Sequence, residues 1–299
     1  MSFLFESFED WRNLCKEKKL SLFQPVLNYE MTQRERTEDE IWSGLATAYQ
    51  VMKEAVQTGL SEEMQSYSGM IENGAKKVYR HPVTVLSKEF QVLISRALAA
   101  KEVNSCMGRV VAAPTAGASG ILPGTMVTLQ EIHHLEDQKI LEGLLIGAGV
   151  ALILEKRASI AGAVGGCQAE TGSAAAMAAA AIVYCLGGTD DQALNAVAIT
   201  IQCMLGLVCD PVAGLVEVPC VVRNASAAAI ANSSAQIALA DVSAVIPVDE
   251  CVDAMAEIGQ SMEVKYKETA LGGLAATPTG KAISKKVLIQ DIDMLDEEA

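Results

Sequence analysis

The sequence predicts an all-α fold, a compact multi-helix bundle with alanine- and glycine-rich buried helices and loops that carry cysteines. Three long stretches contain no charged residue and are rich in alanine, the strongest helix former: 171–189, 192–209 and 224–240. Strand signals are weak, because alternating apolar runs are few and aromatic residues make up only 4% of the chain. Together these features favour helices packed on helices.

The first segment, residues 1–95, is predicted to form a peripheral helical layer. Both tryptophans and all five phenylalanines of the chain precede residue 91. Within this segment 37–53 has the i, i+4, i+7 apolar spacing of an amphipathic helix. Thr37, followed three residues later by Glu40, matches the pattern of a capping box at its start.

Residues 96–282 are predicted to form the helical core that carries the chemistry, and 283–299 a charged surface helix and tail of the same structural domain. In the core, Gly187-Gly188 is expected to end one helix and Thr189 to cap the next. Asp210-Pro211 is expected to end that second helix, and 143–154 is read as a buried helix rather than a strand.

The charge balance excludes some classes of partner. The formal net charge is −14, whereas nucleic acids and anionic membranes are bound by basic surfaces. The uncharged stretches have the length of membrane spans, but they are dominated by small residues and lack basic flanks, so we expect buried helices of a soluble protein. The first ten residues do not resemble a secretory signal, which predicts a cytoplasmic chain.

Three of the eight cysteines stand apart from the others. Cys167, Cys209 and Cys220 each lie beside Gly-Gly or proline, where helices break, and loop-borne thiols can converge on one point. Three thiolates could hold a metal and leave one coordination position open, as catalytic metal sites do. The alternative is that they are small buried apolar residues, the role expected for four further cysteines: Cys15, Cys185, Cys203 and Cys251. Cys106 fits neither class clearly.

A second motif is the loop sequence A-A-P-T-A-G-A-S-G at 112–120. Its backbone amides and hydroxyls could surround a small anion such as a carboxylate, although the segment could also be a plain connection between helices. A weaker echo at 272–281 is either a second loop of the same site or a linker.

Other catalytic signatures are missing from the sequence. It has no Walker A motif, no G-x-G-x-x-G and no Ser–His–Asp arrangement. The three histidines, His81, His133 and His134, are far from the cysteines in sequence and are read as surface or structural residues. Lys156 could form a Schiff base, but no phosphate-binding cup accompanies it.

Several blocks resemble the α-chain family of iron–sulfur-dependent L-serine dehydratases. They are N-S-C-M-G at 104–108, A-P-T-A-G-A-S-G at 113–120, A-S-I-A-G-A-V-G-G-C-Q-A-E-T-G-S-A at 158–174, L-G-L-V-C-D-P-V-A-G-L-V-E-V-P-C-V-V-R-N at 205–224 and G-G-L-A-A-T-P-T-G at 272–280. The resemblance implies that Cys167, Cys209 and Cys220 ligate a [4Fe–4S] cluster. It also implies dehydration of L-serine to pyruvate and ammonia without pyridoxal phosphate.

The implied reaction gives roles to some residues and leaves others open. Three cysteine ligands leave one iron free to assist departure of the substrate hydroxyl. The loop at 113–120 becomes the candidate for the serine carboxylate, with Thr115, Gly117 and Ser119 as donors. Single-chain relatives carry an S-S-H-T motif in an extra domain, and this sequence has none, so a β chain is the expected partner. The general base stays unassigned.

Two alternatives remain at this point. The same chemistry could act on a related small amino acid such as threonine or cysteine. The thiols could instead belong to a non-catalytic metal or redox module whose fourth ligand closes the site.

Overall fold

The computed structural model describes residues 3–83, 85 and 87–297, with side chains up to Gln290. Thirteen α-helices occur in this part of the chain. The described residues form no β-strand, and their β-type pairing is limited to two isolated bridges. The all-α prediction is confirmed. The helices are α1 (Phe8–Lys18), α2 (Phe23–Gln33), α3 (Glu38–Ser61), α4 (Gly74–Arg80), α5 (Lys88–Ser105), α6 (Ile121–His133), α7 (Asp137–Arg157), α8 (Gly162–Gly165), α9 (Ser173–Cys185), α10 (Asp190–Met204), α11 (Cys220–Leu239), α12 (Val248–Ser261) and α13 (Pro278–Glu297).

Five short helical turns connect these elements. They are η1 (Ala116–Ala118), the π-helical turn η2 (Gln168–Gly172), η3 (Val212–Gly214), η4 (Val264–Tyr266) and η5 (Gly273–Ala276). Four of them lie in or beside the segments that the sequence marked as chemical: η1, η2, η3 and η5.

Helix α9 forms the centre of the bundle. It is buried along its length except at Tyr184, and it packs against α6, α7, α10 and α11. Its alanines let these neighbours approach closely. At one such contact, a side chain at Gly143 of α7 would bring its Cβ within 2.7 Å of Cys185 Sγ. The uncharged stretches of the sequence are thus core helices, which need small residues at every face.

The amino-terminal helices join the same core. Trp11 of α1 is fully buried, and its indole donates to Leu22 O at 2.9 Å. The capping box at the start of α3 is confirmed, since Thr37 N donates to Glu40 Oε2 at 2.8 Å and Glu40 N donates to Thr37 Oγ1 at 3.3 Å. The boundary predicted at residue 95 falls inside α5, which packs on α3, α6 and α11.

One helix end was predicted wrongly. We expected the helix after Thr189 to continue to Asp210-Pro211, but α10 ends at Met204. Leu205 already has extended ψ, and Gly206 has a φ of +80°, which glycine adopts without strain. Cys209 therefore lies in a loop five residues beyond the helix. The end at Gly187 and the Thr189 cap are confirmed.

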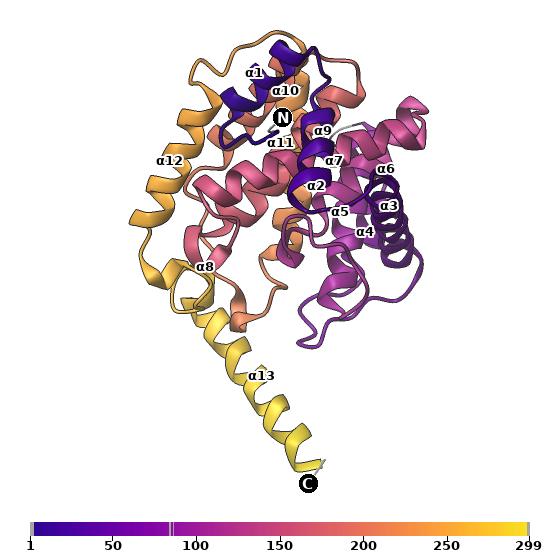
Figure 1. Ribbon diagram of the computed structural model, residues 1–299. Coiled ribbons are helices and arrows are strands. Elements are labelled where there is room, and N and C mark those ends of the chain that lie inside the picture. The colour runs from indigo at the N-terminus through magenta and orange to yellow at the C-terminus, as the bar shows by residue number, and fades with distance from the viewer. Residues whose placement is uncertain (1–2, 84, 86, 298–299) are drawn as a thin grey trace.

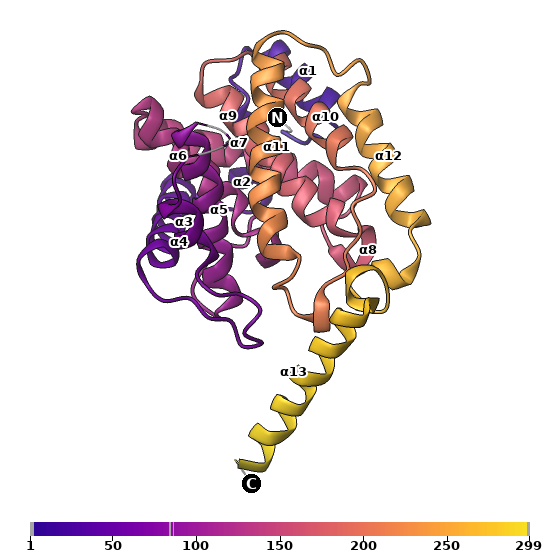
Figure 2. The same ribbon diagram turned by 180° about the vertical axis from the view of Figure 1, so that it is seen from behind.

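Helix α13 leaves the body of the molecule and projects away from it in both views (Figures 1 and 2). Its first turns pack on η3 and η5, close to the cysteine loops. Among the described residues, no helix combines the length and the apolar character that crossing a bilayer requires.

Candidate active site

The three cysteines singled out in the sequence come from separate loops. Cys167 lies between α8 and η2, Cys209 in the loop after α10, and Cys220 is the first residue of α11. All three thiols are free and buried, with exposed fractions of 3%, 3% and 9% in that order. The charges of Cys167 and Cys220 both act on Cys209, so the structure brings the three sulfurs into one neighbourhood.

Burial is the main influence on these thiols. Desolvation raises the pKa of Cys167 and of Cys209, and it raises the pKa of Cys220 to about 12. Two cations act in the opposite direction: Lys101 on Cys220 and Arg223 on Cys167. Three buried neutral thiols so close together are a set that a cationic metal group would deprotonate on binding.

The spacing of the donor atoms bears on the kind of metal group. Among the described residues, the side chains whose ligating atoms all lie within 4.8 Å of one another are Glu170, Cys209 and Glu268, and Cys167 and Cys220 lie outside this tight group. Around a single zinc ion, thiolate sulfurs bonded at about 2.3 Å lie roughly 3.8 Å apart. The three thiols do not all lie within 4.8 Å of one another, so at least one pair of sulfurs is farther apart than around a single zinc ion.

The carboxy-terminal segment fixes the Cys209 loop. Cys209 N donates to Tyr266 O and Glu268 N donates to Cys209 O, both at 2.8 Å. Next to it, the Asp210 carboxylate accepts from Leu274 N at 2.8 Å. The glycine-rich segment at 272–281 therefore lies at the site, which resolves the choice between a second loop and a linker.

Asp210 also joins this loop to α11. Its carboxylate forms an ion pair with Arg223 at 2.9 Å, and Arg223 donates to Val208 O at 2.8 Å. Gln168 connects the other thiol loop to the same region: Gln168 N donates to Leu207 O and its side-chain carbonyl accepts from Gly206 N, both at 2.9 Å. All three cysteine positions are thus held by buried polar contacts.

The loop at 113–120 lies against this centre. Asn224, one turn into α11 from Cys220, donates to Gly117 O and to Cys220 O at 2.9 Å and accepts from Gly120 N at 2.9 Å. Thr115 and Gly117 are partly exposed. Ser119 is fully buried, and its hydroxyl has no hydrogen-bond partner among the described residues. The structure therefore places the 113–120 loop, which contains Thr115, Gly117 and Ser119, against the first turn of α11, where Cys220 lies.

Sequence reasoning missed two charged residues of the site. Lys101 of α5 is fully buried, its ammonium hydrogen-bonds Asn104, and burial lowers its pKa to about 8. Glu170 of η2 has a raised pKa because of burial. A signal for Glu170 was available, because it is the sole charged residue between Arg157 and Asp190.

A pocket of about 510 Å³ opens beside these groups. It passes from the 113–120 loop to the loop before Cys220, and its polar lining includes the partner of Lys101. The lining residues are Tyr67, Asn104, Ser105, Met107, Ala116, Gly117, Leu215, Val216 and Glu217. The pocket reaches the 113–120 loop at Ala116 and Gly117, and none of the three cysteines lines it.

The remaining candidates lie elsewhere. The three histidines are exposed, and Lys156 lies near Glu6 at 3.8 Å on the surface. Cys15, Cys185 and Cys251 are buried as expected. The expectation for Cys203 was wrong: it is exposed, because it falls on the outer side of α10 next to the exposed Gln202.

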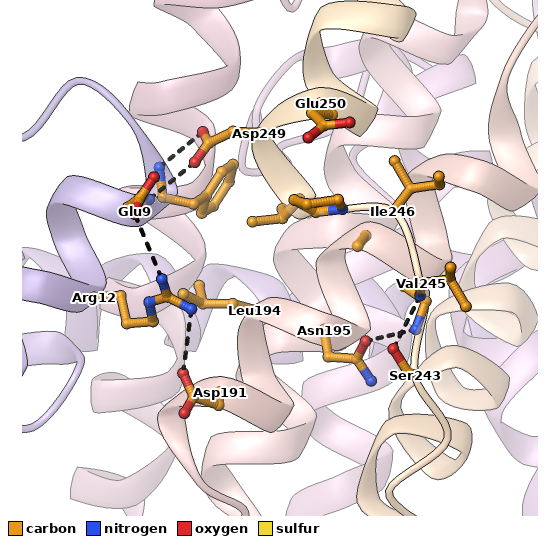
Figure 3. Close-up of a pocket in the computed structure, with 15 residues that line it drawn as sticks. Glu9, Arg12, Asp191, Leu194, Asn195, Ser243, Val245, Ile246, Asp249 and Glu250 are labelled. Carbon is orange, nitrogen blue, oxygen red and sulfur yellow. Dashed lines mark hydrogen bonds and ion pairs between the residues drawn. The ribbon is translucent and has the colours of Figure 1, made fainter.

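A second hollow, of about 520 Å³, lies between α1, α10 and α12 (Figure 3). Its polar groups engage one another: Arg12 lies between Glu9 and Asp191, at 3.7 and 3.9 Å. Asp249 accepts the amides of Phe8 and Glu9 at 3.0 and 2.9 Å. These contacts attach α1 to the core, so the hollow is a structural junction.

The comparisons with known proteins agree with this arrangement. The family model "Serine dehydratase alpha chain" matches residues 17–275. The chain is 42% identical to the probable L-serine dehydratase alpha chain of Bacillus subtilis (strain 168), over 95% of each chain. It is also 42% identical to the L-serine dehydratase alpha chain of Peptoniphilus asaccharolyticus, over 92% of this chain and 96% of that one.

A longer relative matches in part. The L-serine dehydratase of Streptomyces coelicolor is 36% identical over 92% of this chain but only 61% of its own length. The matched region of the family model contains all three thiols, the 113–120 loop, Lys101 and Glu170. On these matches, the chain belongs to the serine dehydratase alpha chain family.

Proposed function

We propose that this chain is the catalytic α subunit of an L-serine dehydratase, a carbon–nitrogen lyase that converts L-serine to pyruvate and ammonia. The observation that carries the proposal is the arrangement of three free buried thiols around one neighbourhood, with a glycine-rich loop that Asn224 holds against the first turn of α11, where Cys220 lies. The family match supports the same reaction.

Cys167, Cys209 and Cys220 would hold a [4Fe–4S] cluster. The donor set suits it, since thiolates are the ligands of such clusters and the three sulfurs do not all lie within 4.8 Å of one another. When bound, a cluster with three cysteine ligands supplies Lewis-acid assistance to the departing β-hydroxyl of the substrate. Pyridoxal phosphate has no part in the proposal.

The loop orients the substrate. Thr115 and Gly117, both partly exposed, contact the serine carboxylate, and Ser119 supports them from beneath. Asn224 keeps the loop at a fixed position relative to Cys220. Orientation of this kind brings the substrate's β-carbon to the metal centre, and it contributes to rate by removing the entropy of the encounter.

The chemistry balances without an oxidant. A base removes the α-proton, hydroxide leaves the β-carbon as water, and the resulting aminoacrylate tautomerises to an imine that water hydrolyses to pyruvate and ammonia. The base is left unassigned, and a β chain is the expected partner because the relatives that match over their whole length are named alpha chains.

Anaerobic reconstitution tests the proposal. The chain is loaded with iron and sulfide, with and without a candidate β chain, and pyruvate formation from L-serine is measured. We expect activity when both chains are present, and none when iron is omitted. L-Threonine and L-cysteine, assayed in parallel, report the substrate preference. A chain that binds iron with the β chain present but forms no pyruvate contradicts the proposal.

A further inference from the structure

Glu170 occupies an unusual position in the site. It follows Cys167 by three residues on the π-helical turn, and its carboxylate lies between two glycines. A side chain at Gly117 would place its Cβ 3.0 Å from Glu170 Oε2, and one at Gly162 would do the same. The carboxylate therefore touches the backbone of the 113–120 loop on one side and the loop before Cys167 on the other.

The surroundings of this carboxylate are negative. Its oxygens lie within 4.8 Å of Cys209 Sγ and of the exposed Glu268 carboxylate. A partly buried carboxylate beside another acid is costly unless a cation approaches it.

The cations of the chain are engaged elsewhere. The Lys101 charge reaches Glu170, but the Lys101 ammonium hydrogen-bonds Asn104. Arg223 pairs with Asp210 and donates to Val208 O. Among the described residues no lysine or arginine lies within ion-pair distance of the Glu170 carboxylate, so its charge is not neutralised by a direct pair.

We propose that Glu170 binds the α-ammonium group of the substrate and thereby selects amino acids over hydroxy acids and simple carboxylates. The inference rests on the proposed function and adds the group that recognises the amine. In an α-amino acid the ammonium and the carboxylate share one carbon, so their binding groups must be neighbours. Gly117 of the carboxylate-binding loop and Glu170 are neighbours of this kind.

Two ligands without a hydroxyl separate amine recognition from turnover. L-Alanine carries both charges, and propionate is the same molecule without the ammonium; neither can lose water. Calorimetric titration of the iron-loaded αβ complex with each ligand gives two dissociation constants. We expect the wild-type complex to prefer L-alanine. A hydrogen bond to a charged group makes a contribution that corresponds to about tenfold or more in affinity.

Glu170→Gln removes the charge and keeps the shape. We expect it to weaken L-alanine binding about tenfold or more, to leave propionate binding unchanged, and to raise the KM for L-serine by a similar factor. Glu263→Gln, at an exposed acid that pairs with Lys265, is the control and should change none of these values.

Three results would overturn the inference, and each would assign Glu170 a different role. Equal weakening of both ligands would mean that Glu170 only shapes the pocket. A fall in iron and sulfide content would make it a ligand of the metal group. A lost kcat with an unchanged KM would make it the base. If the wild-type complex lacks dehydratase activity, the proposed function fails, while the alanine–propionate comparison still tests Glu170.

Discussion

Asn224 donates a hydrogen bond from its side-chain amide to the backbone carbonyl of Gly117, at 2.9 Å. The same side chain also contacts Gly120 N and Cys220 O. A single residue of α11 thus ties the substrate loop to the helix that begins with a proposed metal ligand. The position of the 113–120 loop relative to Cys220 depends on that tie.

Replacing this residue should separate binding from folding. Asn224→Ala removes three hydrogen bonds, two of them buried, and we expect the KM for L-serine to rise at least tenfold because the loop is no longer held beside Cys220. Steady-state pyruvate formation measures it. Asn232→Ala is the control, since Asn232 lies on the same helix and makes only a local bond to Ala228 O at 2.9 Å. An equal effect of both variants would contradict this view of Asn224.

The cysteines divide into two classes that substitution can distinguish. Serine at Cys167, Cys209 or Cys220 should reduce iron and acid-labile sulfide per chain at least tenfold, because each removes a thiolate donor. Cys185→Ser is the matched control: it is also buried, but its Sγ only donates to Lys139 O at 3.3 Å. Analysis after anaerobic reconstitution gives the result. Iron loss of the same size in Cys185→Ser would show that packing, not ligation, is being measured.

Gly273 illustrates a close approach of backbone to a charged group. Its φ is +58°, and a Cβ there would come within 2.3 Å of Asp210 Oδ2. Gly187 has a φ of +80° with nothing within 4 Å, so Gly187→Ala should cost only the left-handed strain of about 1–2 kcal/mol. We expect Gly273→Ala to lower the free energy of unfolding further, by about 1–3 kcal/mol, since the Asp210–Leu274 bond is lost. Urea unfolding of both variants tests this, and equal losses would contradict it.

Glu102 gives a pH dependence of known sign. It lies on α5 and is buried against the start of α4, where its carboxylate accepts from Ala75 N at 3.0 Å, and burial raises its pKa from the usual 4.5. Because the folded pKa is the higher one, wild-type stability is favoured below pH 4.5 and is lost as pH rises through the folded pKa. As pH rises from 4.5 through the folded pKa, we therefore expect the unfolding free energy of the wild type to fall relative to that of Glu102→Gln. Above the folded pKa the difference between the two proteins should stay constant. Exposed Glu257→Gln is the control, and a flat difference for Glu102→Gln would contradict the expected sign.

The parts of this molecule that follow local rules were predictable. Alanine-rich uncharged stretches became core helices, and the Thr37 and Thr189 caps lie where their side chains predict. The end of α10 was missed because Gly206 stops the helix earlier than the proline that follows Cys209. Residue type alone does not tell which of two helix-breaking residues in one segment, here Gly206 and Pro211, ends the helix.

The sequence predicted candidate site residues only where the adjacent residues are unusual, such as Gly-Gly or proline beside a cysteine. The neighbouring Gly165-Gly166 distinguished Cys167 from Cys185, which lies within a helical segment. The density of glycine, serine and threonine distinguished the 113–120 loop from other connections between helices. Lys101 carries no such mark, since it lies within the helical stretch that ends at Ser105, and only packing shows that its buried ammonium acts on Cys220. Asn224 was equally hidden inside a helix that the sequence assigned to the core. Long-range contacts of this kind follow from the fold and not from spacing.

Gln168 holds the segment after Cys167 through bonds that use no cysteine side chain. Its backbone and side chain contact Leu207 O, Gly206 N and Met255 O, with the last bond at 2.8 Å. Small zinc domains, in contrast, fold only when their ion binds. We therefore expect this chain to fold before the proposed cluster is assembled and to keep its fold when the cluster is removed.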